Sequence, residues 1–296
     1  MNPDDMNPDD TNPDAQPGPA LLTTVAQVRA LPRGARAVVM TMGALHEGHR
    51  SLMRAARQRV GDSGVVIVTV FVNPLQFGAG EDFDRYPRQL AADVEACAAE
   101  GVDAVFAPNG REMYPHGEPQ TRVVPGPLAD ILEGAVRPGH FGGMLTVVLK
   151  LLNICEPDVA LFGEKDYQQL ALIRRMAADF DLAARIEGVA TVREEDGLAL
   201  SSRNVYLTAA QRGLAVSLSR ALDAGQAAAA GGGTDADVLA AAAAELAGLA
   251  EVDYLELLGP GLEPEPAADG QARLLVAARL GPTRLIDNCA ITLVAP

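Results

Sequence analysis

The first two thirds of the chain alternate between short apolar runs and stretches whose apolar residues have helical spacing. Short runs rich in β-branched residues are typical of buried strands. Strands that alternate with helices predict a parallel sheet with right-handed crossovers. We therefore predict an α/β fold, with a Rossmann-like parallel-sheet domain that carries helices on both faces. The expected strands are residues 36–42, 64–72, 102–108, 158–163 and 184–192.

The pattern changes near residue 192, where a smaller α+β domain is expected to begin. Residues 208–250 are rich in alanine, and Gly231–Gly233 followed by Thr234 predicts the end of one helix and the cap of the next. Three segments with alternating apolar residues follow, which predicts antiparallel strands. We expect a catalytic domain over 21–191 and a second domain over 192–296 that closes over the active site.

The N-terminus and the cysteines indicate the compartment. Residues 1–20 repeat a pentapeptide rich in Asn, Pro and Asp, so we predict a disordered tail. The tail lacks the basic start and apolar stretch of a secretory signal, and no run of about 18 apolar residues follows. Cys97, Cys155 and Cys289 are scattered, which favours reduced thiols over disulfides or a zinc cluster. We expect a cytoplasmic protein without a membrane partner.

The net charge limits the possible partners. A formal charge of -15 argues against nucleic acid, because phosphate backbones bind to basic surfaces. A small anionic ligand would need a local positive site. Among the 24 basic residues only Lys150 and Lys165 are lysines, and a lysine presents a compact point charge that arginine does not replace. Lys165 follows an expected strand and is the candidate, whereas Lys150 lies in an apolar helical stretch and is expected to snorkel.

Four polar clusters follow four of the expected strands. They read MGALHEGH, NPLQFGAGEDF, GEKDYQQ and REEDGLALSSRN in chain order. In open α/β sheets, ligands bind beyond the carboxyl ends of the strands. We therefore expect these clusters to meet at one crevice.

The first cluster predicts an anion site. Its glycines allow a tight turn from strand to helix, and the helix N-terminus presents free backbone N–H groups. His46 and His49, three residues apart on the first helical turn, lie on one face and can donate to the same phosphate. A zinc pair is disfavoured because helical zinc histidines are usually spaced by four. The alternative is a capped helix whose two histidines are surface residues.

The clusters resemble a known family. MGALHEGH resembles the HIGH-type motif of the nucleotidyltransferase superfamily, in the form found in the pantoate–β-alanine ligase family, and the other clusters are similar to that family too. With VDYLEL and RLLVAARLGPTRLIDN, the resemblance covers residues 21–295. It implies that ATP activates (R)-pantoate as a pantoyl adenylate with release of diphosphate. β-Alanine then displaces AMP to give pantothenate. The resemblance also implies Mg²⁺ with ATP and a homodimer.

The resemblance assigns roles residue by residue. His49 would be the proton donor and His46 a phosphate contact, while Lys165 and Arg203 would neutralise phosphate charge. Asp166 would bind a ribose hydroxyl. Gln76 and Gln169 would bind pantoate, with Gln76 also near β-alanine and Asn73 in the same turn. The full set implied for ATP is Met42, Gly43, Ala44, Leu45, His46, Glu47, Gly48, His49, Gly163, Glu164, Lys165, Asp166, Val192, Leu200, Ser201, Ser202 and Arg203.

The metal ligands stay open at this level. Asp93 or the acids of GEDFD are weak candidates for holding Mg²⁺, and a surface position on a helix is the expected role of Asp93. Gly197 is expected to act as a hinge for loop closure. The chain departs from the family pattern at Met40, Arg50, Gly142 and Leu200, which puts loop rigidity and affinity in question without removing a catalytic group.

Three alternatives remain. One is a nucleotidyltransferase that acts on another small acid or phosphate substrate and does not use β-alanine. A second is a nucleotide-binding module without catalysis, which the presence of His46, His49, Lys165 and Arg203 disfavours. A tRNA synthetase would need a basic anticodon-binding region, and the acidic, alanine-rich C-terminal part has none.

Overall fold

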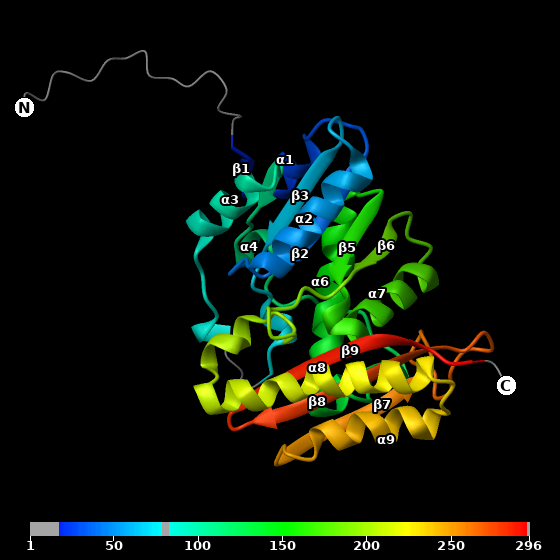
Figure 1. Ribbon diagram of the computed structural model, residues 1–296. Coiled ribbons are helices and arrows are strands. Elements are labelled where there is room, and N and C mark those ends of the chain that lie inside the picture. Colours follow the sequence, from blue (N-terminus) through cyan, green and yellow to red (C-terminus); the bar gives the residue numbers. More distant parts are fainter. Residues whose placement is uncertain (1–17, 79–82, 295–296) are drawn as a thin grey trace, which may run out of the picture.

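The computed structural model describes residues 18–78 and 83–294, so most of the predicted tail lies outside the described residues. A parallel sheet of six strands forms the first domain (Figure 1). Its strand order is β1-β4-β3-β2-β5-β6. The chain order of the strands reverses direction between β2 and β5, which makes this the topological switch point where α/β proteins bind ligands. The strands are β1 (Ala20–Leu22), β2 (Arg36–Thr41), β3 (Val65–Val70), β4 (Ala104–Phe106), β5 (Val159–Gly163) and β6 (Arg185–Val189).

All five predicted strands are confirmed, and one strand was missed. β1 spans three residues and pairs with the edge of β4, Ala20 lying opposite Ala104. A segment this short carries no periodic signal. Because β1 begins at Ala20, the last residue assigned to the tail is part of the sheet.

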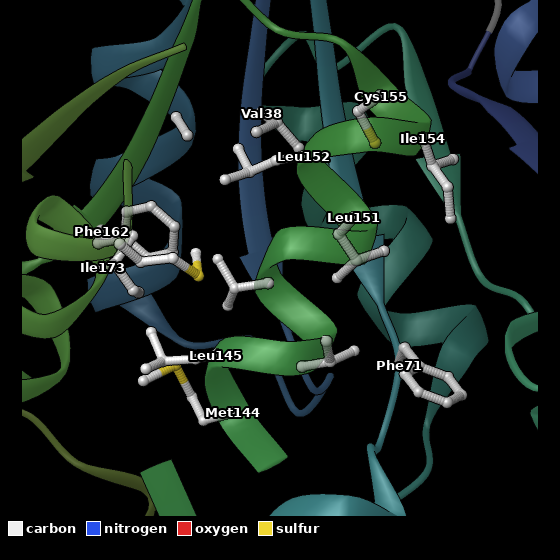
Figure 2. Packing of buried hydrophobic residues seen from close by; sticks show 14 of the residues in the cluster. Val38, Phe71, Met144, Leu145, Leu151, Leu152, Ile154, Cys155, Phe162 and Ile173 are labelled. Carbon is white, nitrogen blue, oxygen red and sulfur yellow. The ribbon is translucent and has the colours of Figure 1, made fainter. Parts of the chain in front are cut away.

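Helices cover both faces of the parallel sheet, as predicted. Val38 of β2 packs with α6 and α7, whereas the next residue, Val39, packs with α2 on the opposite face. Figure 2 shows α6 side chains, including Leu145 and Leu152, packed beside Val38 and Phe162. The helices of this domain are α1 (Val25–Arg29), α2 (Glu47–Val60), α3 (Leu90–Ala99), α4 (Gly110–Met113), α5 (Glu133–Val136), α6 (His140–Cys155) and α7 (Tyr167–Asp179). Short 3-10 turns are η1 (Pro74–Gln76), η2 (Phe83–Arg85), η3 (Pro127–Ala129), η4 (Glu164–Asp166) and η5 (Ser202–Tyr206).

The second domain is the predicted α+β unit, with an antiparallel sheet in the order β7-β8-β9. Thr234 caps α9 by accepting a hydrogen bond from the backbone of Asp237, as the sequence indicated. One face of the sheet packs on α8 and α9, and the other contacts α7 through Leu275. The elements are α8 (Ala209–Ala230), α9 (Asp235–Leu246), β7 (Glu251–Leu258), β8 (Gln271–Leu280) and β9 (Thr283–Thr292).

The predicted thiols are confirmed, because Cys97, Cys155 and Cys289 are all free. Burial raises the pKa of each of these thiols to about 12, so they are protonated and unreactive near neutral pH. Among the described helices, none combines the length and the apolar character that crossing a membrane requires.

Candidate active site

The four polar clusters meet at one cleft of about 290 Å³ beyond the carboxyl ends of β2, β3, β5 and β6. The cleft therefore lies at the switch point of the sheet. Fourteen of the predicted site residues line it: Met42, His46, Gly48, His49, Gln76, Gly163, Lys165, Asp166, Gln169, Val192, Leu200, Ser201, Ser202 and Arg203.

The two histidines cap their own helix. Nδ1 of His46 accepts a hydrogen bond from the backbone N–H of Gly48 at 3.1 Å, and Nδ1 of His49 accepts from the N–H of His46 at 3.3 Å. The ring centroids are 4.1 Å apart. Because Nδ1 accepts in both rings, each neutral imidazole carries its proton on Nε2. The helix thus presents two N–H donors side by side in the cleft.

Both imidazoles are held in the neutral form. Burial is the main cause that lowers the pKa of His49 to about 3. Protonation next to the His46 ring and the Lys165 ammonium is also unfavourable, and the opposing effect of Asp166 is smaller than the burial effect. Burial and the Lys165 ammonium also lower the pKa of His46, against an opposing effect of Asp166. At neutral pH the pair therefore donates hydrogen bonds without carrying positive charge.

Asp93 holds the turn that precedes the histidines. Its carboxylate accepts hydrogen bonds from the backbone N–H of Ala44 at 3.3 Å and of Leu45 at 2.9 Å. The turn is left-handed, with φ of 86° at Gly43 and 54° at Ala44. A Cβ on Gly43 would lie 2.9 Å from Oδ2 of Asp93. The expected surface position of Asp93 is wrong, because the residue is 1% exposed and points into the protein.

The 3-10 turn after β3 places Gln76 in the cleft and Asn73 behind it. Nε2 of Gln76 lies 2.9 Å from the sulfur of Met42. Asn73 is 1% exposed, donates to Oε1 of Gln76 at 3.2 Å, and accepts from the hydroxyl of Tyr114 at 2.8 Å. Asn73, which was predicted to contact the substrate, does not line the cleft, and its side chain supports the turn through these bonds.

The turn after β5 brings charge into the cleft. Nζ of Lys165 lies 3.7 Å from Oδ1 of Asp166. Although partial burial opposes ionisation, the cations of Lys165 and Arg203 hold the pKa of Asp166 below its usual value. Gln169, one turn into α7, also lines the cleft. Together these residues place a lysine ammonium, a carboxylate and a neutral amide on one side of the site.

The loop that carries Arg203 also lines the cleft. Ser201 caps the 3-10 turn by accepting from the N–H of Arg203 at 3.3 Å, and the Leu200 N–H donates to the carbonyl of Val192 at 2.9 Å. Gly197 has a φ of 89°, which suits the hinge role that the sequence predicted. Arg203 is exposed, so its guanidinium can reach a ligand.

Five further residues assigned to ATP do not line the cleft with their side chains. Gly43, Ala44 and Leu45 shape the turn. Glu47 faces outward and forms ion pairs with Arg50 and Arg54. The carboxylate of Glu164 accepts a hydrogen bond from Arg273 at 3.1 Å. In a helix or turn, neighbouring side chains point in different directions, which a continuous assignment over 42–49 ignores.

Arg137 and His140 line the cleft and were missed. Nδ1 of His140 lies 2.8 Å from the carbonyl oxygen of Gln76, and its Nε2 lies 3.2 Å from Nη1 of Arg137. A guanidinium in this position can bind a carboxylate. The available signal was that His140 is one of only four histidines and opens the long helix α6.

The departures from the family pattern are accommodated. Arg50 points away from the cleft and pairs with Glu100 at 2.6 Å. A Cβ on Gly142 would lie 3.5 Å from the nearest atom, a backbone oxygen, so a larger residue also fits there. Met40 and Leu200 both line the cleft with apolar side chains.

The described residues offer no group of three or more His, Cys, Asp or Glu side chains able to hold a metal. Asp93 is committed to two backbone N–H groups. Of the acids in GEDFD, Glu81 and Asp82 lie outside the described residues, and Asp84 is exposed. Asp166 is the carboxylate that lines the cleft within the described part of the chain.

Comparison with known proteins identifies the family. The family model described as pantoate-beta-alanine ligase matches residues 20–290. The chain is 60% identical over 282 residues to a pantothenate synthetase from Nocardia farcinica, covering 94% of this chain and 86% of that protein. It is 59% identical to one from Mycolicibacterium smegmatis, covering 90% of this chain and 84% of that protein.

Solved structures agree with the sequence comparison. A pantothenate synthetase from Thermus thermophilus superposes with a TM-score of 0.85 at 50% identity, covering 91% of this chain and 98% of that chain. A pantoate-beta-alanine ligase from Francisella tularensis, in complex with beta-gamma ATP and beta-alanine, gives a TM-score of 0.74 at 34% identity, covering 92% and 97%. With its parallel sheet, its histidine turn and these relatives, the chain belongs to the pantoate–β-alanine ligase family.

Proposed function

We propose that the chain is an AMP-forming ligase that condenses (R)-pantoate with β-alanine to pantothenate at the expense of ATP. The observation that carries this proposal is the composition of the cleft. Two imidazole donors, two neutral amides and three cations, Arg137, Lys165 and Arg203, face one space beyond the switch point. Nucleotidyl transfer to another acid or phosphate is not favoured, because the relatives are pantothenate synthetases.

In the first step, a carboxylate oxygen of pantoate attacks the α-phosphorus of ATP. The bond from that phosphorus to the bridging oxygen of the β-phosphate breaks, and diphosphate leaves with added negative charge. Lys165 and Arg203 stabilise this charge, and His46 and His49 donate their Nε2–H groups to phosphate oxygens. Proton transfer from His49 to the leaving group would require the bound polyphosphate to raise the pKa of this ring, which is about 3 in the free protein.

In the second step, the amine of β-alanine attacks the acyl carbon of the adenylate. The bond to the AMP oxygen breaks, the new amide nitrogen loses a proton, and AMP leaves. This sequence needs no side-chain nucleophile, so positioning and charge stabilisation supply the catalysis. Gln76 and Gln169 hold the hydroxyls of pantoate without repelling its carboxylate, and Arg137 adds positive charge for a substrate carboxylate.

We propose that Mg²⁺ enters with ATP. Mg²⁺ is usually held by substrate phosphates with one or two protein carboxylates, and it neutralises phosphate charge. Asp166 fits this role, because it lines the cleft in an ionised form. The other Mg²⁺ ligands would be phosphate oxygens and water.

The quaternary and cellular setting follows from the same resemblance. We propose a homodimer located in the cytoplasm. The three free thiols support the cytoplasmic location, because reducing compartments keep cysteines unpaired. We also propose that the domain boundary lies near residue 192 and that the second domain closes over the site. Light scattering on the eluted peak from size exclusion tests the dimer.

The deciding experiment follows diphosphate and AMP in parallel, with ATP, (R)-pantoate and β-alanine omitted in turn. We expect diphosphate release to require pantoate and AMP release to require both acids. Replacing (R)-pantoate with its enantiomer provides the matched control and should abolish both signals. AMP release that ignores β-alanine would contradict the proposed ligase.

A further inference from the structure

The turn that carries Lys165 is held by the second domain. Asn288, in β9, is 4% exposed and donates both hydrogens of its side-chain amide to that turn. Its Nδ2 lies 3.0 Å from the carbonyl oxygen of Glu164 and 2.8 Å from that of Lys165. These two carbonyls belong to the peptide groups on either side of the Lys165 Cα. One side chain of the second domain therefore fixes the backbone from which the lysine projects.

A buried arginine sets the orientation of the Asn288 amide. Nε of Arg273, in β8, donates to Oδ1 of Asn288 at 2.7 Å. Because a guanidinium only donates, Oδ1 must face it and Nδ2 must face the carbonyls. Arg273 also donates to Glu164 at 3.1 Å, and its guanidinium carbon lies 3.9 Å from the ring centroid of Tyr167. The Asn288 amide and the Arg273 guanidinium thus hold the turn from Glu164 to Tyr167.

The residue next to Asn288 holds the loop that leads to Arg203. The carboxylate of Asp287 is 2% exposed and accepts two bonds from Arg193, at 2.6 Å and 3.1 Å. Arg193 donates in addition to the carbonyl of Gly197, at the predicted hinge of the loop that leads to Arg203. Oδ1 of Asp287 also accepts from the backbone N–H of Asn288 at 2.8 Å, which couples the two side chains.

We propose that Asp287 and Asn288 are positioning residues that set the separation and orientation of Lys165 and Arg203. These two cations line the same cleft from different segments, and adjacent residues of one strand anchor those segments. The proposal rests on the proposed function, in which both cations act on the polyphosphate of ATP. Neither Asp287 nor Asn288 needs to touch the nucleotide for this role.

The test uses Asn288→Asp, which keeps the shape and the acceptor for Arg273 but removes both donors to the turn. We expect kcat for pantoate-dependent diphosphate release to fall about 100-fold, because small misplacements of a catalytic group have costs of this order. The KM for β-alanine should stay within about twofold, since β-alanine enters only at the second step. Arg273→Gln, which removes the orienting guanidinium, is the second variant and should lose about 10-fold.

A double-mutant cycle with Lys165→Ala separates positioning from general support. If Asn288 acts through Lys165, Asn288→Asp should change the rate of the Lys165→Ala enzyme by less than about threefold. Additive losses would overturn the proposal. The corresponding cycle pairs Asp287→Asn with Arg203→Ala.

Gln226→Ala is the matched control. Gln226 donates one side-chain hydrogen bond at 3.1 Å to the carbonyl of Ala290, which lies in the same strand as Asn288. It is outside the lining of the cleft. We expect full kcat for this variant. Circular dichroism and the midpoint of thermal unfolding monitor folding of every variant. If the unsubstituted protein is active and Asn288→Asp has the same kcat, the positioning role alone is refuted. If the unsubstituted protein is inactive with all three substrates, the proposed function is refuted.

Discussion

The two turns at the switch point of the sheet are held in different ways. The histidine turn after β2 is fixed within its own domain, by the capping bonds of His46 and His49 and by Asp93. The lysine turn after β5 is fixed from the second domain, through Asn288. Loosening the contact between the domains should therefore disturb the lysine turn and leave the histidine turn in place.

The largest effect expected from this comparison is that of His49→Ala. We expect adenylate formation to fall about 1000-fold, because the variant loses the Nε2–H donor at the reacting phosphate. It also loses the cap on the His46 N–H, which should reduce the free energy of unfolding by about 1 kcal/mol. Single-turnover diphosphate release and urea unfolding measure the two effects.

His49→Asn is the control that separates the chemical role from the cap. An Asn side chain at position 49 can accept a hydrogen bond from the backbone N–H of His46, as Asp237 accepts one from Thr234 in α9. We expect normal stability with the same loss of rate. A rate near that of the parent in either variant would refute the role of the Nε2–H group.

Asp93→Asn tests the local anchor of the histidine turn. The amide places a donor against a backbone N–H in a buried site, so we expect a loss of about 1 to 3 kcal/mol in stability. We expect kcat/KM for ATP to fall about 10-fold as the turn relaxes. The Mg²⁺ concentration for half-maximal rate should not change, because both carboxylate oxygens already accept from the turn. A shifted Mg²⁺ dependence with intact stability would instead make Asp93 a metal ligand.

The same contrast explains which parts of the site the sequence could predict. The histidine turn has a local signature, because its glycines, histidines and helix lie within nine residues after a strand. The Lys165 turn could also be predicted locally, because its polar residues directly follow an expected strand and Lys165 is one of only two lysines. Asn288 carries no such signal, since the two carbonyls to which it donates are more than 120 residues away and an Asn in a strand is chemically ordinary.

Burial was the other quantity that the sequence left undetermined. Asp93 was expected on the surface because charged helix residues usually are, and its two backbone donors come from 48 and 49 residues upstream. Asn73 was placed in the cleft because it shares a turn with Gln76. The structure orients the two side chains differently, since Asn73 is bonded to Tyr114. The sheet was predicted well because buried strands have a strong local pattern, and β1 was too short to show one.

The low pKa of His49 predicts a pH dependence of the folding stability. Between pH 6.5 and about 3 the unfolded state binds a proton at His49 that the folded state does not bind. Stability therefore rises with pH in this window and is lost as the pH falls. We expect a loss of about 1 to 2 kcal/mol from this group between pH 7 and pH 5. Urea unfolding at the two pH values measures it, and His49→Asn should remove this part of the difference. An equal difference in parent and variant would contradict the low pKa.

The smallest expected effect is that of Arg50→Leu, one residue after His49. Arg50 points away from the cleft and pairs with Glu100, which also has Arg54 at 3.0 Å. Because the pair is partly exposed and Glu100 keeps a partner, we expect at most about 1 kcal/mol lower stability. The kcat and the KM for ATP should match those of the parent. A fall in kcat of more than about threefold would show that the outer face of α2 also positions the histidines, and the local anchor would then extend beyond the turn itself.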